Sequence, residues 1–266
     1  MNTPIKTLSL LGSGWLGLPL AKHFISLGYQ VNASTRSAER LSELAVTGIQ
    51  PFIVDIDQLD QLDNALAEFL DANILIINIT SKNLAGFAQL ISQIEQSPVK
   101  HVLFVSSTSV YQNLNREVSE NHQAELANSP LLQIEQLFTR NPHFSTTILR
   151  FSGLIGYRRH PGRFFGQGKV VSQADAPVNL IHRDDCIGII DAIIEQQVWG
   201  VVFNGCADTH PSKREFYTYA RQLLGMPAPE FADDTEQAFK IVSNAKVKQV
   251  LDYQFKYPDV MDIDFD

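Results

Sequence analysis

The feature that most constrains the fold of this chain is a regular alternation of strand-like and helix-like segments over its first 150 residues. Short runs rich in apolar and β-branched residues are each followed by a segment with helical spacing of its apolar positions. Parallel strands linked by crossover helices produce this pattern. Two runs, ILIINI and VLFVSS, are apolar almost throughout, so we expect both of their faces to be buried. The pattern therefore predicts an α/β fold with a doubly wound parallel sheet.

The boundaries of the expected elements follow from these runs. Strands are predicted at residues 7–12, 30–35, 51–55, 73–79, 101–107 and 145–152, and helices at 15–28, 37–47, 59–71, 84–96 and 124–140. Beyond Ser152 the rhythm breaks, because glycine and proline crowd residues 153–177. Later elements are a helix from Asp184 to Gln196, a strand near 201–204 that returns to the main sheet, and a helix over SKREFYTYARQLLG.

Composition argues against several classes of protein. No apolar run reaches the roughly 18–20 residues of a membrane-spanning helix, and the N-terminal stretch lacks the pattern of a signal peptide, so we expect no membrane partner. A net charge of −8 argues against nucleic acid as a partner. Cys186 and Cys206 lack metal-type spacing. We therefore expect reduced structural cysteines, no metal site and a cytoplasmic location.

A glycine-rich stretch, LLGSGWLGLPLAKHF, follows the first predicted strand. Gly12, Gly14 and Gly17 have the spacing G-x-G-x-x-G, directly between a strand and a helix. Such glycines permit a tight turn and let the backbone approach a pyrophosphate, which rests on the helix N-terminus. We expect this turn, including Trp15 and Leu16, to bind a dinucleotide in a Rossmann sheet, and a tight turn without a ligand is the alternative.

The end of the second predicted strand distinguishes NADP from NAD. An Asp or Glu holds the ribose hydroxyls of NAD at this position, whereas here the chain has Ser34, Thr35 and Arg36. Hydroxyls and a guanidinium suit a 2′-phosphate, so NADP is favoured and NAD is the alternative. Arg36, like Arg40 one turn later, has a solvated arginine as its competing interpretation. Asp55 can accept from the adenine amino group or cap a helix.

Several stretches together resemble the extended short-chain dehydrogenase/reductases. They are GSGWLG, FIVDID, VLFVSSTSVYQ, ILRFSGLIG, NLIHRDDCIGIIDAII and VVFNGCAD, in the family's order over nearly the whole chain. The combination of GWLGLPLA, SSTSVY and RHPGRFF is similar to the atypical YeeZ-type subgroup, which is NAD-dependent epimerase/dehydratase-like. The resemblance implies a nicotinamide cofactor and a small-molecule substrate. Family members often dimerise through the helices expected here near 84–96 and 124–140, which implies a homodimer.

Active members of this family use a Ser or Thr on the fifth strand with a Tyr-x-x-x-Lys on the next helix. The resemblance gives Ser107 the first role, but Ala127 and Leu131 stand at the Tyr and Lys positions. The chain has no Lys between residues 100 and 169 and no Tyr between residues 111 and 157. We therefore consider Tyr111 as the replacement proton donor, with packing as the competing interpretation. Further candidates for that role are Glu120, His122, Tyr157 and His160.

A basic stretch, YRRHPGRFF, follows the sixth predicted strand and resembles the family's substrate-binding segment. Arg158, Arg159, His160 and Arg163 can together hold a phosphate or carboxylate, and Gly162 can let the backbone approach it. A surface loop paired with acids is the alternative. We expect residues 1–155 to form the dinucleotide-binding Rossmann domain, and residues 156–266 to form mainly a small substrate lobe.

Two functions remain open from the sequence. The first is an NADP-dependent epimerase/dehydratase-like or reductase-like enzyme that acts on an anionic small molecule without the standard Tyr-x-x-x-Lys pair. The second is a protein that binds NADP without turnover, as a sensor or regulator. The retained SSTSVY and the basic stretch favour the first, and the missing Tyr and Lys favour the second.

Overall fold

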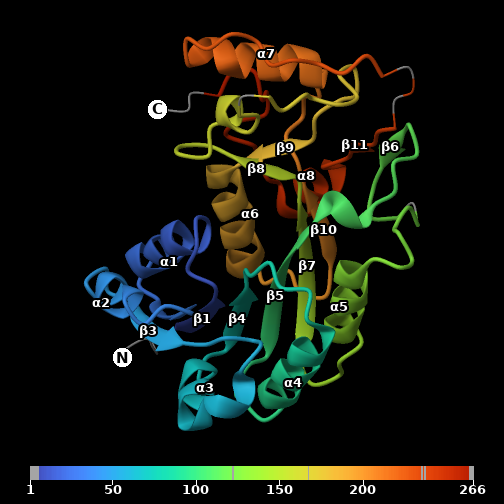
Figure 1. Ribbon diagram of the computed structural model, residues 1–266. Coiled ribbons are helices and arrows are strands. Elements are labelled where there is room, and N and C mark those ends of the chain that lie inside the picture. Colours follow the sequence, from blue (N-terminus) through green and yellow to red (C-terminus); the bar gives the residue numbers. More distant parts are fainter. Residues whose placement is uncertain (1–5, 122, 167, 235, 237, 264–266) are drawn as a thin grey trace. The chain divides into compact units, whose positions relative to one another are not determined.

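The computed structural model describes residues 6–263 except 122, 167, 235 and 237. Its centre is a seven-stranded parallel sheet with the order β10-β7-β5-β4-β1-β2-β3 (Figure 1). The strands of this sheet are β1 (Thr7–Leu11), β2 (Gln30–Thr35), β3 (Gln50–Ile53), β4 (Ile74–Ile77), β5 (His101–Ser107), β7 (Ser145–Phe151) and β10 (Val202–Gly205). The predicted α/β fold with a doubly wound parallel sheet is confirmed.

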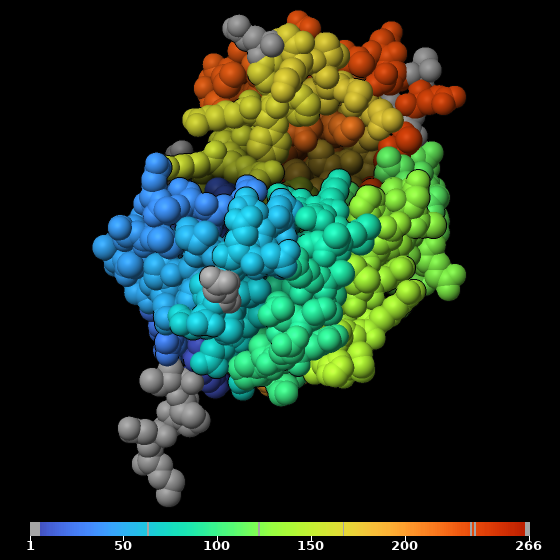
Figure 2. All heavy atoms as spheres, turned by 60° about the horizontal axis from the view of Figure 1, so that its bottom comes forward, coloured from blue at the N-terminus to red at the C-terminus, as the bar shows by residue number. Residues whose placement is uncertain are grey.

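Helices alternate with the strands of this sheet as far as β10, as the sequence pattern indicates, and two more follow β10, of which α8 was not predicted. They are α1 (Gly17–Ser26), α2 (Arg40–Ala45), α3 (Asp63–Phe69), α4 (Leu84–Ile94), α5 (Pro130–Thr139), α6 (Arg183–Glu195), α7 (Lys213–Leu223) and α8 (Ala245–Leu251). Figure 2 shows α4, in green, beside α5, in yellow-green. No helix in the described part of the chain has the length and hydrophobicity needed to cross a membrane.

The prediction of a helix from residue 124 was wrong at its start. α5 begins only at Pro130, and the hydroxyl of Ser129 accepts a hydrogen bond from the Leu132 amide at 3.4 Å. A serine followed by proline is a strong N-cap signal, because proline at the first helical position lacks an N–H that would be unsatisfied. Residues 124–126 are extended instead, and Leu126 N–H donates to the Val110 carbonyl at 2.7 Å.

Four short strands were not predicted. β6 (Glu117–Val118) pairs with β11 (Ile241–Val242), and β8 (Gly153–Ile155) pairs with β9 (Leu180–His182), in both cases in parallel. Runs of two or three residues carry too little periodicity to be recognised in a sequence. Three short 3₁₀ helices, η1 (Leu59–Gln61), η2 (Thr108–Val110) and η3 (Pro161–Arg163), complete the described elements.

The chain divides into two compact units. Unit 1 comprises Met1–Ser106, Ala127–Leu149 and Gln197–Val202, and unit 2 comprises Ser107–Leu126, Arg150–Gln196 and Phe203–Asp266. Each unit has its own buried cluster of apolar side chains. The cluster of unit 2 includes Ile155, Phe216 and Val260. Two stable cores therefore exist, and each can position its own functional groups.

Aromatic packing joins α4 and α5 to the sheet in unit 1. The Phe138 ring of α5 lies 5.3 Å from Phe104 of β5 and 5.9 Å from Phe87 of α4, measured between ring centroids. The centroid of the Phe144 ring lies 6.3 Å from that of Phe138. All four side chains are buried. Phe138 is therefore central to this layer of the core.

Replacing Phe138 by alanine should lower the free energy of unfolding by about 3–5 kcal/mol, because the removed ring leaves a cavity among three other aromatic rings. Leu137 is the matched control, since it is the preceding residue of α5 and is 38% exposed. Its alanine variant should change the free energy by only about 0.5 kcal/mol. Urea unfolding followed by circular dichroism measures both, and equal losses would contradict this view of the core.

Candidate functional site

The glycine turn between β1 and α1 is fixed by two close approaches of the backbone. Gly12 has φ +105°, and a Cβ placed on it would collide with the Asn78 carbonyl oxygen. A Cβ on Gly17 would collide with the carbonyl oxygen of Gly12. These two glycines are therefore required by the turn itself, since no larger residue fits either position.

Gly14 differs from these two glycines. A Cβ on Gly14 would meet nothing within 4 Å, and the residue is exposed. At the N-cap of α1, Leu16 makes no side-chain capping bond. A turn with open space beside its backbone, leading into a helix without a side-chain cap, suits an anion that needs N–H donors.

Four hydrogen bonds hold the turn in place. Gly12 N–H donates to Ser34 Oγ at 2.9 Å, and Ser13 N–H donates to the Ser34 carbonyl at 3.0 Å. The Asn78 side-chain amide donates to the Gly12 carbonyl at 3.3 Å, and Arg40 Nη2 donates to the Ser13 carbonyl at 3.1 Å. Ser34 is only 2% exposed. Its hydroxyl thus supports the turn from behind, and its expected contact with the cofactor stays a prediction.

The chain just after β2 carries one cationic side chain, Arg36, that has no partner among the described residues. Thr35 is buried, and its hydroxyl accepts from the Ser37 amide at 3.1 Å. Arg36 is exposed, and within the described residues its guanidinium has no hydrogen-bond or ion-pair partner. Arg40, by contrast, is tied to the turn and lies 3.5 Å from Glu43. Arg36 is therefore available to an anionic ligand.

The other expected cofactor residues lie around the turn and at the next strand end. Leu16 belongs to the core at 3% exposure, whereas Trp15 is partly exposed. Asp55, just beyond β3, is partly exposed and accepts from the Asp57 amide at 3.1 Å. Asp57 in turn accepts from Asn83 Nδ2 at 2.6 Å. The carboxylate of Asp55 thus caps a local turn and keeps acceptor capacity for a further donor.

Ser107, in unit 2, is the N-cap of η2. Its Oγ accepts from the Ser109 amide at 3.1 Å, and its side chain is partly exposed. A hydroxyl carries one proton to donate in addition to its acceptor sites. No acceptor for that proton occurs among the residues that the structure describes. Ser107 can therefore donate a hydrogen bond to a small molecule.

Tyr111 is placed differently from Ser107, because it is only 1% exposed. Its hydroxyl donates to Asn204 Oδ1 at 2.9 Å and accepts from Arg150 Nη1 at 2.8 Å. Arg150 Nη1 also pairs with Glu125 Oε1 at 2.7 Å. Glu120 completes the cluster, since its carboxylate accepts from the backbone N–H of Asn204 at 2.7 Å.

This network has a clear electrostatic consequence for Tyr111. Burial raises the pKa of Tyr111 to about 12, although the neighbouring Arg150 opposes the increase. The phenol therefore stays protonated at neutral pH, and the hydroxyl is bonded on both sides. The structure gives Tyr111 a structural role, and its acid–base role stays a prediction. His122, another candidate from the sequence, lies outside the described residues.

The basic stretch beyond β8 contributes exposed arginines and one buried histidine. Arg158, Arg159 and Arg163 are exposed. His160 is only 7% exposed, and its Nδ1 accepts from the Gly162 amide at 3.0 Å as the cap of η3. A Cβ on Gly162 would meet the Ala220 carbonyl oxygen of α7 at 2.5 Å. The expectation that Gly162 serves a ligand is thus replaced by packing between η3 and α7.

Tyr157 precedes these arginines and is held in an unusual conformation. Its φ is +53°, in the left-handed region that most residues avoid. Its hydroxyl donates to the Asp184 carboxylate at 2.9 Å, and the Arg183 guanidinium lies 3.9 Å from the ring centroid. Burial, followed by the Asp184 carboxylate, raises the pKa of Tyr157. The side chain is 37% exposed and is fixed by its partners on α6.

The described part of the chain has no group of three or more His, Cys, Asp or Glu residues that is arranged to hold a metal ion. Cys186 and Cys206 are unpaired and buried. Burial raises the pKa of the Cys206 thiol to about 12, so it stays protonated at neutral pH.

Residues 12–185 of this chain match the family model of NAD(P)H-binding proteins. The chain belongs to the NAD(P)H-binding family. It is also 30% identical to protein YeeZ of Escherichia coli strain K12, over 96% of this chain and 97% of that protein.

Solved structures share the fold of this NAD(P)H-binding protein. A protein named as an NAD-dependent epimerase/dehydratase from Methylobacillus flagellatus has 28% identity and a TM-score of 0.74, covering 97% of this chain and 95% of that chain. UDP-glucuronic acid 4-epimerase from Bacillus cereus, in complex with NAD, has 20% identity and a TM-score of 0.76, with 95% and 94% covered. The resemblance predicted from the sequence motifs is confirmed.

Replacing Tyr111 by phenylalanine should lower the free energy of unfolding of this NAD(P)H-binding protein by about 1–3 kcal/mol, because Arg150 and Asn204 would each lose a buried partner. Tyr219 provides the matched control, since within the described residues its hydroxyl has no hydrogen-bond partner. Its phenylalanine variant should be as stable as the unmodified protein. Chemical unfolding measures both, and indistinguishable curves for the two variants would disprove the structural role of Tyr111.

Proposed function

We propose that this protein binds NADP and uses it on an anionic small molecule, as an epimerase/dehydratase-like or reductase-like enzyme. The observation that carries the cofactor assignment is the uncommitted Arg36 guanidinium, exposed directly after β2 with no acid beside it. In dinucleotide-binding sheets the ribose of the adenosine half lies at this strand end. A guanidinium favours the doubly charged 2′-phosphate, whereas an acid there would repel it.

The glycine turn supports the same proposal. Open space at Gly14 and the uncapped start of α1 suit the pyrophosphate. Arg40, bound to the Ser13 carbonyl with a side chain 35% exposed, adds positive charge beside the turn. Asp55 keeps an acceptor for the adenine amino group. When bound, the nicotinamide supplies or accepts a hydride.

The groups that we propose for substrate binding all belong to unit 2. We assign the anionic part of the substrate to the exposed Arg158, Arg159 and Arg163, since guanidinium groups bind phosphate and carboxylate oxygens with several donors. His160 faces inward and caps η3, so its part is to hold this loop in shape. Ser107 donates a hydrogen bond from its hydroxyl group to a substrate oxygen and so polarises the carbonyl or hydroxyl group there.

A second function is favoured by a specific observation. The Tyr111 hydroxyl is bonded to both Arg150 and Asn204 and is shielded from solvent. Ala127 and Leu131 stand at the positions to which the resemblance assigns the Tyr and Lys, so neither residue can transfer a proton there as in active family members. A protein that binds NADP without turnover, as a sensor or regulator, fits that arrangement.

Replacing Arg36 by alanine should weaken NADP binding by about 10- to 100-fold, the worth of one or two charge-assisted hydrogen bonds to the 2′-phosphate. NAD lacks that phosphate, so its affinity should change less than about threefold. Isothermal titration calorimetry with both cofactors gives the ratio. Arg140 is an exposed arginine at the end of α5, and its alanine variant serves as the control. Equal losses for NADP and NAD in the Arg36 variant would overturn the 2′-phosphate assignment.

Replacing Ser107 by alanine separates the two functions. The purified protein is first screened with NADPH against aldehydes, ketones and nucleotide sugars. For any substrate turned over, Ser107→Ala should lower kcat by about 100-fold or more, as expected for a lost hydrogen bond to a reacting oxygen. Ser109→Ala is the matched control, because the hydrogen bond to Ser107 comes from the backbone amide of Ser109, which the substitution keeps. Turnover that survives unchanged in Ser107→Ala would exclude the proposed role, and tight NADPH binding without turnover would support the sensor.

A further inference from the structure

Arg221, on α7 of unit 2, is a buried arginine with only 8% of its surface exposed. Its Nη1 donates to the Phe165 carbonyl at 2.9 Å, and its Nε is enclosed without a hydrogen-bond partner. Among the residues that the structure describes, no carboxylate pairs with this guanidinium. Arginine is almost never buried unless an acid pairs with it. The cost of burying this charge is therefore not offset within the described chain.

The two segments that meet at Arg221 contain no acidic residue. Residues 216–229, from the middle of α7 into the following loop, have no Asp or Glu, and none occurs from residue 136 to residue 174. The acid next to this part of α7 is Glu215, whose carboxylate accepts from the Ser212 hydroxyl at 2.8 Å in the capping box of the helix. Neither the helix around Arg221 nor the loop that it contacts thus supplies a partner for its charge.

α7 holds the loop that follows η3 through both the backbone and the side chain of Phe165. The backbone carbonyl accepts from Arg221, and the Phe165 ring packs edge-on against Tyr217 with centroids 4.7 Å apart. Tyr217 and Arg221 are four residues apart, so they lie on the same face of α7. The backbone of η3 also lies against this helix, because a Cβ on Gly162 would meet the Ala220 carbonyl oxygen at 2.5 Å. One helix therefore fixes this loop at several points.

The link from Phe165 back to Arg163 is short and hydrogen-bonded. Arg163 is the last residue of η3, and its amide donates to the His160 carbonyl at 3.1 Å. The amide of Phe164 donates to the Pro161 carbonyl at 3.0 Å. The Arg163 side chain itself is exposed. A turn that is tied to α7 two residues later thus presents the Arg163 guanidinium to solvent.

We propose that Arg221 is a positioning residue for the anionic substrate, because its bond to the Phe165 carbonyl fixes the turn that presents Arg163. This inference rests on the proposed function, in which Arg163 binds the anion. A buried charge without a partner lowers the stability of a protein, and a cost of this kind is typical of residues kept for function. Arg221 acts through Arg163 and does not touch the substrate itself.

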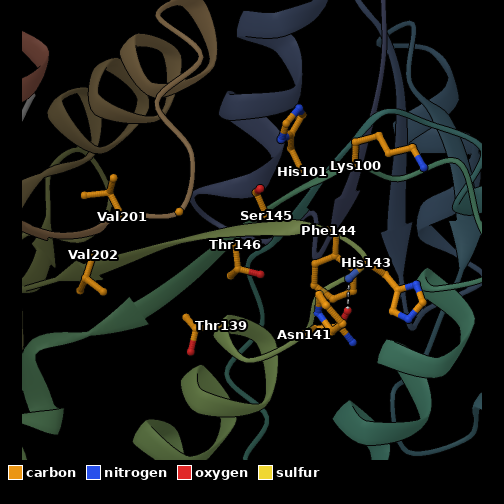
Figure 3. Close-up of a pocket in the computed structure, with 12 residues that line it drawn as sticks. Lys100, His101, Thr139, Asn141, His143, Phe144, Ser145, Thr146, Val201 and Val202 are labelled. Carbon is orange, nitrogen blue, oxygen red and sulfur yellow. Dashed lines mark hydrogen bonds between the residues drawn. The ribbon is translucent and has the colours of Figure 1, made fainter.

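A charged side chain of unit 1 provides the control. Lys100 lines a pocket of about 520 Å³ together with His101 and Ser145. Figure 3 shows the Lys100 side chain extending away from both of these residues. Lys100 is exposed, and it belongs to a different unit from the basic loop. Lys100→Gln therefore removes one positive charge without changing the contacts of η3 or α7.

Inorganic pyrophosphate is the probe, titrated by calorimetry into protein that is already saturated with NADP. Arg163→Ala should weaken its binding by about tenfold or more, the worth of a charge-assisted hydrogen bond. Arg221→Met should weaken it by about fivefold or more, because the turn loses its tie to α7. Arg221→Lys keeps a donor for the Phe165 carbonyl and should restore the affinity to within about twofold. Lys100→Gln should leave the affinity unchanged.

Two further readouts separate positioning from structural support. Arg221→Met should keep or raise the Tm, because an apolar side chain removes the cost of a buried charge. A purely structural Arg221 would instead lower the Tm by roughly 4 °C or more on this substitution. In protein that already carries Arg163→Ala, Arg221→Met should weaken pyrophosphate binding by less than about twofold, because residues that act together are not additive.

The inference is overturned if Arg221→Met binds pyrophosphate as tightly as Lys100→Gln does, if its Tm falls as a structural role requires, or if its loss and that of Arg163→Ala multiply in the double variant. A loss in Arg163→Ala with none in Arg221→Met would contradict this inference alone. Unchanged binding in Arg163→Ala would contradict the proposed role of Arg163 in substrate binding. No saturable binding of pyrophosphate would overturn both.

Discussion

The glycine turn of unit 1 depends on how closely α1 approaches the end of β1. Gly17 lies against the Gly12 carbonyl, and only the absence of a side chain allows that contact. Hydrogen bonds from Gly12 to Ser34 and from Asn78 to Gly12 then hold the turn against the two neighbouring strand ends. Gly12 and Gly17 are needed for this packing, whereas Gly14 has open space beside its backbone, and we propose that space for a phosphate. The turn thus requires glycine for steric reasons at positions 12 and 17, and it has open space beside position 14.

The second unit is organised around a buried charge. Arg150 is almost fully buried, and its guanidinium requires acceptors that it finds in Glu125 and Tyr111. Breaking a buried pair by removing one partner is strongly destabilising, so the tyrosine hydroxyl is committed to this network. The proposed chemistry therefore relies on Ser107 and the exposed arginines beyond β8, and an acid–base role of Tyr111 stays a prediction.

The sheet and its helices could be predicted because the spacing of apolar residues in a short stretch of sequence indicates a helix or a strand. The start of α5 was missed although Ser129 and Pro130 carry a recognisable capping signal, which the apolar spacing from residue 124 obscured. The supporting role of Ser34 and the burial of Tyr111 could not be predicted. Their partners are 22 and 93 residues away along the chain, and only the folded sheet brings them together.

The most direct test of this account uses two fragments of the cofactor whose proposed contacts are all with residues of unit 1. Calorimetry with adenosine 2′,5′-bisphosphate and with AMP isolates the adenosine half of the cofactor and therefore depends on Arg36 and the glycine turn. The account predicts that the bisphosphate binds about tenfold or more tightly, because only it carries the 2′-phosphate. Equal affinities for the two fragments, or no saturable binding of either, would contradict the assignment of NADP as the cofactor.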